Sequence, residues 1–405
     1  MVVILKEFFD QASERFDLSE REKAHQASIR AMARDSLIPL CERADDRRVN
    51  RALVSEMGRL GLLEYLFPKV EGDSYQGSTS ALELCLIREA LASVSTGSET
   101  AFALQGLGGY PILRYGARKV QDTWIPAIAN GSAVAAFALS EAGAGSDAGN
   151  LALRAVPDGQ GWRLTGEKTW ISNAPEADVY TVFARTEAGA GPRGITAFAV
   201  PGLRRGLSGT HIDLLAPHPI GSLVFEGVRV EAYEMLGEFN QGFKVAMRTL
   251  DLFRPSVGAF AVGMGQAGLE EAIKYSSTRL VFGDSLVSLQ SVSHSLAKVA
   301  MNLEAARLLV YRAAVAYDMG IERREVTKMS AMAKLYATEA AQDAIDRAVQ
   351  ICGARGLVRG HPLEHLLREV RATRIYEGAS EVQLDIISRS LWSVIDSGST
   401  GVPSD

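Results

Sequence analysis

The chain has 405 residues, of which 47% are hydrophobic and 22% are charged, values typical of globular proteins that exclude long disordered stretches. Its net charge of −5 disfavours a broad basic face for nucleic acid, and no apolar run approaches the roughly 18 residues of a membrane span. Cys41, Cys85 and Cys352 are far apart and form neither a disulfide framework nor a zinc pattern, so we expect a cytoplasmic protein.

The length predicts two or three domains, and the first, residues 1–133, has the periodicity of helices. Its opening segment, Met1–Asp10, soon becomes acidic and lacks the basic region of a cleaved leader, so we expect no leader peptide. Ser19 and Glu22 form a capping box, which predicts that a helix begins there and continues to Leu37.

Two further patterns divide this helical domain. Leu53, Met57, Leu60 and Leu63 recur at helical spacing, which predicts one amphipathic helix. The glycines and the proline of Gly106–Pro111 predict a turn before another helix.

Residues 134–242 change to the period of β-strands. Trp162–Thr165 alternates between apolar and polar side chains, and Gly166–Lys168 follows it as a predicted turn. The further strands that we predict are Val179–Ala184, Ile195–Val200 and Leu223–Val230. Several short strands with close turn signals are typical of an antiparallel sandwich or barrel.

Residues 243–396 return to helical periodicity and predict a bundle. An apolar seam repeats every three or four residues and consists of Leu296, Val299, Leu303, Ala306 and Val310. Helices are also expected over 328–350 and Val382–Val394, before a flexible tail, 397–405. The order of elements predicts an α+β multidomain protein with an N-terminal helical domain, a middle antiparallel β-barrel or sandwich, and a C-terminal four-helix bundle.

Two motifs have competing interpretations. Gly263–Gly268 fits the G-x-G-x-x-G pattern of dinucleotide sites, but helical residues precede it where such a site needs a strand, so we favour close helix packing. His361 and His365 are spaced like two metal ligands, but no third ligand accompanies them and Pro362 indicates a helix start, which we favour.

Three segments can serve a binding or catalytic site, although each also has a purely structural interpretation. Ser140–Asp147 is a glycine-rich link that either approaches a flat or anionic ligand or is an ordinary loop. Trp170 ends a strand and either shields a planar cofactor or fills the core. Glu377 stands at a glycine-broken junction of two helices, where a carboxylate either becomes a base in a dry cavity or lies on the surface.

Together these segments resemble the acyl-CoA dehydrogenase family of flavoproteins over nearly the whole chain. The six segments that carry the resemblance, in the family's order and spacing, are Phe137–Asp147, Trp170–Asn173, Asp251–Arg254, Arg279–Gly283, Gln350–Gly356 and Arg374–Gln383. The resemblance implies the three-domain fold predicted above, with FAD bound between the β-domain and the bundle in a homotetramer or homodimer.

The resemblance also implies which residues bind the cofactor and the substrate. Those beside the flavin of their own chain are Phe137, Leu139, Ser140, Gly145, Ser146, Trp170, Ser172, Ala379 and Glu381. Those that reach the FAD of a neighbouring subunit are Arg279, Phe282, Gln290, Gln350, Ile351, Gly353 and Ala354. Those that face the acyl thioester and its CoA portion are Ser146, Asp251, Arg254, Gly378 and Arg389.

By the same resemblance Glu377 is the catalytic base, since the position that some relatives use instead is occupied by Phe253, which accepts no proton. The implied reaction is α,β-dehydrogenation of a saturated acyl-CoA to the trans-2-enoyl thioester, with flavin N5 accepting the hydride and an electron-transfer flavoprotein accepting the electrons. Three alternatives stay open: a dehydrogenase of carrier-protein-bound acyl groups in a biosynthetic pathway, an acyl-CoA oxidase, and a nucleic-acid-associated relative without a metabolic role. We expect no metal ion and no nucleic-acid or membrane partner.

Overall fold

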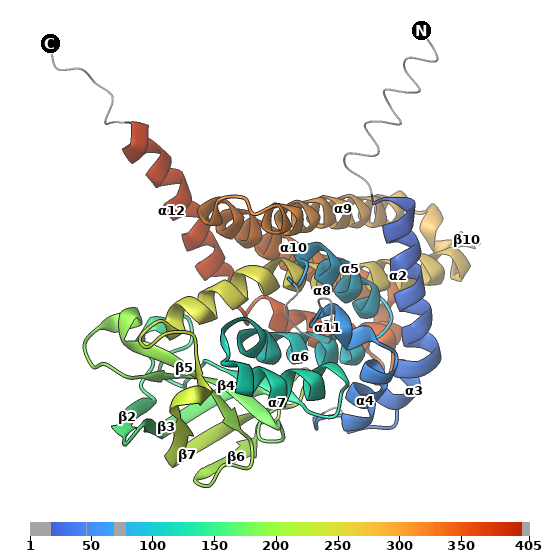
Figure 1. Cartoon of the computed structure of the whole chain (residues 1–405). Helices are drawn as coiled ribbons and strands as arrows, with labels where there is room; N and C mark the ends of the chain where they lie inside the picture. The colour runs from blue at the N-terminus through green and yellow to red at the C-terminus, as the bar shows by residue number, and fades with distance from the viewer. Residues whose placement is uncertain (1–17, 46, 69–77, 399–405) are drawn as a thin grey trace, which may run out of the picture.

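The computed structural model describes residues 18–45, 47–68 and 78–398. Figure 1 shows three parts that follow one another along the chain: a group of helices, a sheet at one side, and a set of long helices. Within the described ranges no helix is long and apolar enough to cross a membrane. The segment Met1–Asp10, for which we expected no leader peptide, lies outside the described residues.

The N-terminal part consists of helices, and a polar cap sets the start of the first one. Ser19 Oγ accepts a hydrogen bond from the backbone N–H of Glu22, and the Glu22 carboxylate accepts one from the Ser19 N–H at 2.7 Å, so the predicted capping box is confirmed. The elements are α2 (Glu20–Met32), a π-helical turn (Ala33–Leu37), α3 (Ile38–Cys41), α4 (Arg51–Arg59), α5 (Ala81–Ala92), α6 (Thr96–Tyr115) and α7 (Arg118–Ala129).

Two boundaries predicted for this part are wrong. The apolar stripe does not form one helix, because α4 ends at Arg59 and Gly61 takes a left-handed φ of 73° before a short 3-10 turn, Leu62–Tyr65. The segment Gly106–Pro111 is not a turn but lies inside α6. A Cβ at Gly108 would come within 2.5 Å of the backbone nitrogen of Ala136, so this glycine allows the helix to approach the first strand.

The middle part is one eight-stranded sheet. Its strands are β1 (Ala135–Ala138), β2 (Arg154–Asp158), β3 (Gly161–Ser172), β4 (Val179–Arg185), β5 (Ile195–Pro201), β6 (Leu207–His211), β7 (Ile220–Glu231) and β8 (Met235–Leu236). They lie in the order β6-β7-β3-β2-β4-β5-β8, with β1 beside β4. Most neighbours are antiparallel as predicted, but β1 and β2 both pair with β4 in parallel.

One turn predicted in this sheet is wrong. β3 continues through Gly166–Lys168, and its chain reversal toward β2 lies instead at Gly159, which has a φ of 61°. A register shift in the β3–β7 pairing occurs between Leu164 and Thr165. Gly166, which follows directly and has a φ of 137°, therefore accompanies an irregularity within the strand and not a turn.

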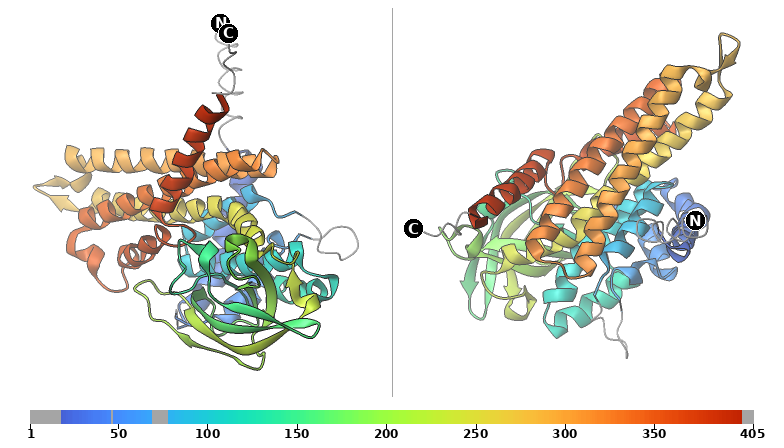
Figure 2. Two further views of the ribbon diagram at one scale, coloured as in Figure 1. Left: turned by 90° about the vertical axis from the view of Figure 1, so that its left-hand side faces the viewer. Right: turned by 90° about the horizontal axis from the view of Figure 1, so that it is seen from above.

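The C-terminal part is built on long helices that lie side by side in both views of Figure 2. Its elements are α8 (Gly242–Thr278), β9 (Leu280–Val281), β10 (Asp284–Ser285), α9 (Gln290–Asp318), α10 (Arg323–Cys352), α11 (Pro362–Thr373) and α12 (Ser380–Gly398). Every position of the predicted seam on α9 is buried, which confirms that seam. The predicted fold class is confirmed, except that α12 includes residues 397–398 of the predicted tail, and residues 399–405 lie outside the described part.

Glycines bring α8 close to its neighbours. A Cβ at Gly263 would lie 2.5 Å from the carbonyl oxygen of Glu89 in α5, and a Cβ at Gly265 would lie 2.5 Å from the side chain of Leu303 in α9. The whole G-x-G-x-x-G motif lies inside α8, and the residues directly before it are helical. The packing interpretation is therefore confirmed, and the dinucleotide interpretation is rejected.

Candidate active site

Glu377 lies in the turn between α11 and α12, which confirms the predicted break between two helices. Its φ of 51° is left-handed, a conformation that costs a non-glycine residue about 1–3 kcal/mol and persists only where the surroundings enforce it. The neighbouring carbonyl of Gly378 accepts hydrogen bonds from Lys334 Nζ at 2.8 Å and from Gln383 Nε2 at 2.9 Å. Helices α10 and α12 thus hold the turn in one conformation. The next predicted site residues along the chain are Gly378, Ala379 and Glu381.

One oxygen of the Glu377 carboxylate is withdrawn from water, although the residue as a whole is half-buried. Its Oε2 atom is buried and has no hydrogen-bond partner among the described residues. Burial raises the pKa of Glu377, and the positive charges of Arg88, Arg254 and Lys334 offset part of that rise. A desolvated carboxylate with a free oxygen and a raised pKa is a stronger base than a solvated one, so this side chain is suited to proton abstraction.

A second buried carboxylate, Glu99 on α6, belongs to a polar cluster that sequence reasoning missed. Glu99 forms an ion pair with Arg88 of α5, and the exposed fractions of these side chains are 1% and 3%. Arg88 Nη1 also donates to Ser256 Oγ of α8 at 2.6 Å. Burial raises the pKa of Glu99 to about 7, although the charge of Arg88 opposes the rise. Three helices therefore fix a guanidinium whose charge acts on Glu377.

The glycine-rich segment Ser140–Asp147 is fastened to the sheet through Glu141. Glu141 Oε1 accepts a hydrogen bond from Lys168 Nζ of β3 at 2.8 Å, and Lys168 also donates to the carbonyl of Leu139 at 2.8 Å. The same carboxylate accepts two backbone N–H groups just before β2, at 2.5 and 3.0 Å. Lys168 is fully buried, and burial lowers its pKa to about 8.

The tip of this segment leaves room for a ligand. A Cβ at Gly143 or Gly145 would meet no atom within 4 Å, so neither glycine is required for packing. Among the predicted cofactor contacts here, Gly145 and Ser146 are exposed, Phe137 and Ser140 are half-buried, and Leu139 is buried. The loop thus presents its backbone to the surface from a rigid base.

The end of β3 lies against the same segment, since the Thr169 N–H donates to the carbonyl of Ser140 at 3.1 Å. The exposed fraction of Trp170 is 53%, and its φ is 59°. Ser172 Oγ lies 2.7 Å from Nε2 of His218, a contact that the sequence analysis did not anticipate. An uncovered indole beside a glycine-rich loop provides a surface on which a planar cofactor can stack.

Backbone strain concentrates at the predicted site. The described chain has five non-glycine residues with a left-handed φ, and three of them, Trp170, Phe282 and Glu377, are predicted site residues. The other two are Asn173 and Asn240, and asparagine tolerates this conformation. Strained residues of other types cluster at functional positions, so the backbone singles out the same three side chains as the sequence motifs.

The residues predicted to face the thioester lie in two environments. Asp251 and Arg254 of α8 are each 5% exposed, and Asp251 also accepts a hydrogen bond from Arg323 Nε at 2.8 Å. The buried Nε of Arg254 has no hydrogen-bond partner in the described chain. Arg389 on α12 is exposed. Arg254, but not Arg389, is therefore one of the positive charges that lower the pKa of Glu377.

The residues predicted to reach a neighbouring subunit do not join the site of their own chain. Arg279 is the C-cap residue of α8, and Phe282 lies in the turn between β9 and β10, a hairpin that Figures 1 and 2 place at the end of α8 and α9 remote from the sheet. Phe282 is 100% exposed. The other members of this set lie at the start of α9, at the end of α10 and in the 3-10 turn Gly353–Leu357 that follows α10, and they are Gln290, Gln350, Ile351, Gly353 and Ala354.

The two histidines with metal-ligand spacing serve structural roles. Nδ1 of His361 accepts a hydrogen bond from the N–H of Leu363 at 3.2 Å, so the predicted helix start at Pro362 is confirmed. Nε2 of His365 lies 2.6 Å from Thr96 Oγ1. In the ranges that the structure describes, no group of three or more His, Cys, Asp or Glu side chains could hold a metal ion.

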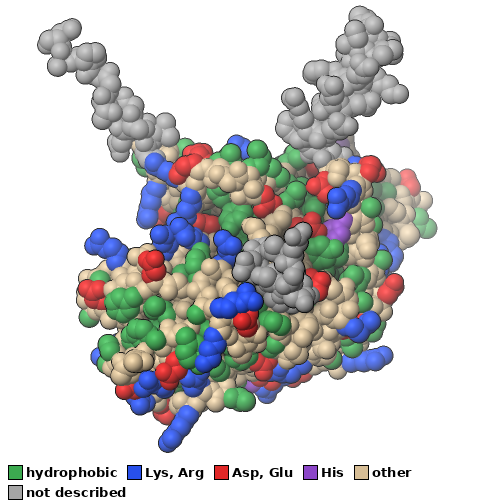
Figure 3. All heavy atoms as spheres, viewed as in Figure 1, with side chains coloured by type: hydrophobic (Ala, Val, Ile, Leu, Met, Phe, Trp, Pro, Cys, Tyr) green, Lys and Arg blue, Asp and Glu red, His purple; other side chains and the backbone are tan. Residues whose placement is uncertain are grey.

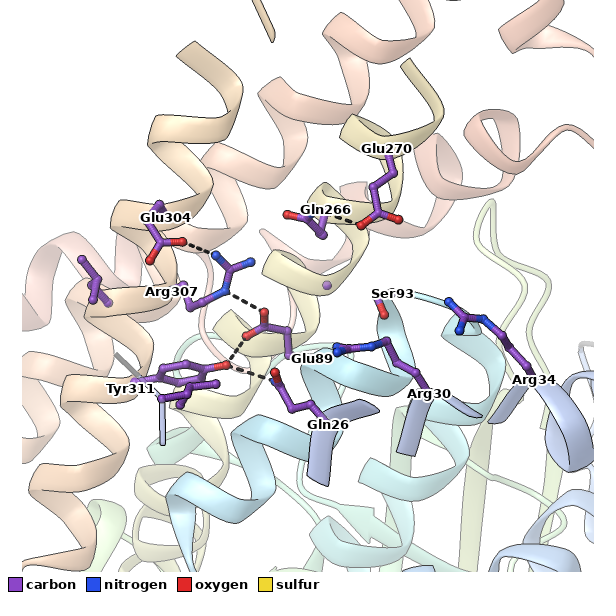
Figure 4. Close-up of a pocket in the computed structure, with 13 residues that line it drawn as sticks. Gln26, Arg30, Arg34, Glu89, Ser93, Gln266, Glu270, Glu304, Arg307 and Tyr311 are labelled. Atoms are coloured by element: carbon purple, nitrogen blue, oxygen red, sulfur yellow. Dashed lines mark hydrogen bonds and ion pairs between the residues drawn. The ribbon is translucent and has the colours of Figure 1, made fainter. Parts of the chain in front are cut away.

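A separate cavity of about 470 Å³ opens between α2, α5, α8 and α9, as Figure 4 shows. Glu89 lies in it and accepts hydrogen bonds from Arg307 Nε at 2.8 Å and from the Tyr311 hydroxyl at 2.7 Å. Arg307 also pairs with Glu304. None of the predicted site residues line this cavity, so we do not assign it to the active site.

On the face of the molecule in Figure 3, charges of both signs are mixed with hydrophobic side chains.

Two observations fit a flavin at this site, and a third fits its acyl substrate. Trp170 leaves its ring uncovered, the glycine-rich loop beside it is open, and Glu377 keeps a buried oxygen without a partner in the described chain. The first two suit a planar ring with phosphate groups, and the third suits a substrate carbon that must lose a proton.

Comparison with known proteins gives matches along the chain. The family models for the acyl-CoA dehydrogenase N-terminal, middle and C-terminal domains match residues 19–132, 136–228 and 240–392. The short-chain specific acyl-CoA dehydrogenase, mitochondrial, of Rattus norvegicus is 36% identical over 384 residues, which are 93% of this chain and 91% of that protein. Cyclohexane-1-carbonyl-CoA dehydrogenase of Geobacter metallireducens is 33% identical over 93% of this chain and 98% of its own. The structure of butyryl-CoA dehydrogenase from Megasphaera elsdenii superposes with a TM-score of 0.86 at 33% identity, covering 93% of this chain and 99% of that one.

Proposed function

The chain belongs to the acyl-CoA dehydrogenase family, and we propose that Glu377 is the catalytic base of its reaction. The protein is an FAD-dependent oxidoreductase that dehydrogenates a saturated acyl-CoA. When bound, FAD accepts the hydride that leaves the β-carbon. The observation that carries the role of Glu377 is its buried, unpartnered Oε2 in a turn held at a left-handed φ.

In this proposal Glu377 removes the proton from the α-carbon of the thioester. Burial disfavours the charged carboxylate, so its uptake of a proton relieves a desolvation cost that is already present in the resting protein. Arg88, Arg254 and Lys334 limit that cost, because their positive charges favour the ionised form of the carboxylate. Because Lys334 also fixes the Gly378 carbonyl, the position of the base is set before the substrate arrives.

For the cofactor we propose that Trp170 and Ser172 flank the flavin ring and that the Ser140–Asp147 loop lies beside it. The exposed Trp170 and the open glycines of the loop support this placement. The hairpin of β9 and β10, which Arg279 precedes and in which Phe282 lies, stands at the end of the long helices remote from the sheet in Figures 1 and 2, so we propose that Arg279 and Phe282 reach the FAD of a second copy in a homotetramer. A guanidinium such as that of Arg279 suits a pyrophosphate because it forks onto two phosphate oxygens.

The remaining parts of the proposal concern organisation and partners. We propose a division into domains 1–133, 134–242 and 243–396, which follows the order of helices, sheet and helices. We further propose a cytoplasmic protein that passes its electrons to an electron-transfer flavoprotein. The named relatives act on short-chain, cyclohexane-1-carbonyl and butyryl thioesters, so the first substrates to test are short and ring-bearing acyl-CoAs.

The experiment that tests this function is anaerobic titration of the purified yellow protein with such acyl-CoAs. We expect that at least one of these acyl-CoAs bleaches the flavin absorbance and is converted to its trans-2-enoyl-CoA. If none of them bleaches the flavin, the proposal is contradicted. The same acyl groups on a carrier protein are tested beside the CoA thioesters. If only the carrier-protein thioesters bleach the flavin, the enzyme is a carrier-dependent dehydrogenase. Rapid reoxidation of the reduced protein by oxygen instead identifies an oxidase.

A further inference from the structure

Behind the end of β3 the structure holds a histidine that the proposed reaction does not use. Nε2 of His218 lies 2.7 Å from Ser172 Oγ, within hydrogen-bond distance. His218 belongs to the segment 212–219 that leads from β6 into β7, whereas Ser172 is the last residue of β3. The contact therefore joins two stretches of chain that are 46 residues apart.

The backbone around this pair is fixed on both sides. Ser172 pairs with Ile220 in the β3–β7 ladder, and the Asn173 N–H donates to the carbonyl of Pro219 at 2.8 Å. His218 stands between Pro217 and Pro219, whose rings fix the φ angle on either side of it. The imidazole is therefore presented to Ser172 by a stiff segment.

The pair also lacks a competing charge. Burial lowers the pKa of His218 to about 4, and no charged group contributes to that shift. The imidazole is thus neutral near pH 7 and has one donor nitrogen and one acceptor nitrogen. A serine hydroxyl both donates and accepts, so the tautomer of His218 decides whether the Ser172 proton is used in this bond or is free to point elsewhere.

We propose that His218 is a positioning residue for the flavin, which acts by fixing the orientation of the Ser172 hydroxyl. The inference rests on the proposed function, which places Ser172 and Trp170 beside the flavin ring. A free serine hydroxyl rotates among several directions, whereas a hydroxyl bonded to a half-buried imidazole has its remaining donor or acceptor capacity aimed to one side. His218 then affects the cofactor without touching it.

The test is a double-mutant cycle with Ser172→Ala, His218→Leu and the combined variant, read out on bound FAD instead of turnover. Each single variant loses one hydrogen bond, so we expect about three- to tenfold weaker FAD binding and a shifted flavin absorbance spectrum and midpoint potential. Because His218 acts through Ser172, the combined variant should show no further shift beyond Ser172→Ala. His218→Gln, which restores a polar group near Nε2, should recover most of the wild-type spectrum.

Matched controls separate this role from a contribution to folding. His294→Gln changes an exposed histidine on α9 and should leave the flavin spectrum and FAD affinity unchanged. Thermal unfolding reports whether His218→Leu disturbs the sheet. In the double variant His218→Gln/Ser172→Ala, the shift of the flavin spectrum should equal that of Ser172→Ala alone.

Two results overturn the inference, and they differ from failure of the proposed function. A wild-type flavin spectrum and affinity in His218→Leu, or effects of His218→Leu that add fully to those of Ser172→Ala, exclude action through the hydroxyl. If Ser172→Ala and Trp170→Ala both leave bound FAD unchanged, the proposed flavin placement itself is wrong, and the inference falls with it.

Discussion

Replacing Lys168 by methionine should destabilise the protein, because it removes one partner of a buried ion pair. Lys168 is 0% exposed, Glu141 is 8% exposed, and the two side chains lie 2.8 Å apart. Breaking such a pair from one side costs about 3–5 kcal/mol, since the remaining charge stays buried. Glu141 keeps two backbone donors, so we expect a cost near the lower end, about 3 kcal/mol. With an unfolding entropy of about 2.1 cal/mol/K per residue and 405 residues, the melting temperature should fall by about 3–4 °C.

Thermal unfolding followed by circular dichroism measures this effect, and the exposed Lys298→Met is the matched control. The double variant Lys168→Met/Glu141→Gln should recover part of the lost stability, because no unpaired charge remains.

The pH dependence of stability gives a second readout. The pKa of Lys168 is about 8 in the folded protein and about 10.4 in an unfolded chain, so the unfolded state binds more protons between these values. Wild-type stability should therefore rise with pH across that window, and this rise should vanish in Lys168→Met. A Lys168→Met protein with the melting temperature of the wild type would refute the reasoning.

Three further predictions concern the active site. Arg88→Gln removes a charge that lowers the pKa of Glu377, so the acidic limb of the pH profile of kcat should move to higher pH, and an unmoved limb would contradict this. Gly378→Ala places a Cβ 2.2 Å from Gln383 Nε2 at a φ of 98°, and displacement of the turn should lower kcat by about ten- to a hundredfold without changing the circular dichroism spectrum. Phe282→Ser should lower the FAD content per subunit, measured by absorbance, while the melting of FAD-free protein stays unchanged because the side chain is 100% exposed.

Local patterns in the sequence predict much of the helical architecture. The capping box at Ser19 and the apolar seam on α9 both appear in the structure as expected. The break at Glu377 is also local, since Gly378 interrupts two helical repeats within a few residues. Each of these signals depends on neighbours in sequence, which is why it is readable without coordinates.

Glycine signals are harder to interpret, because a glycine either permits a turn or makes room for a neighbour. Gly108 and Gly166 both suggest turns, but the first lies in the middle of α6 against a strand and the second lies within β3. Gly263 is packed against α5 in the same way. Only the position of the neighbouring element decides between these uses, and sequence spacing does not contain it.

The contacts that adjust the active site are not readable from the sequence. Arg88 and Glu99 come from separate helices, and their ion pair has no characteristic spacing. The bond between Ser172 and His218 depends on the β3–β7 register. The left-handed φ of Glu377 is imposed by bonds to the next carbonyl and has no signature in the residue type. These features arise from tertiary packing, whereas the motifs around them are local.

The central claim is that Glu377 removes the substrate's α-proton, and single-turnover flavin reduction in Glu377→Gln tests it most directly. The amide keeps the shape of the side chain but accepts no proton, so the variant should hold wild-type amounts of FAD and bind acyl-CoA. Its flavin should bleach at least about a thousandfold more slowly than that of the wild type under anaerobic conditions. The exposed Glu226→Gln should bleach at the wild-type rate. Bleaching of Glu377→Gln at the rate of the wild type would show that another group takes the proton.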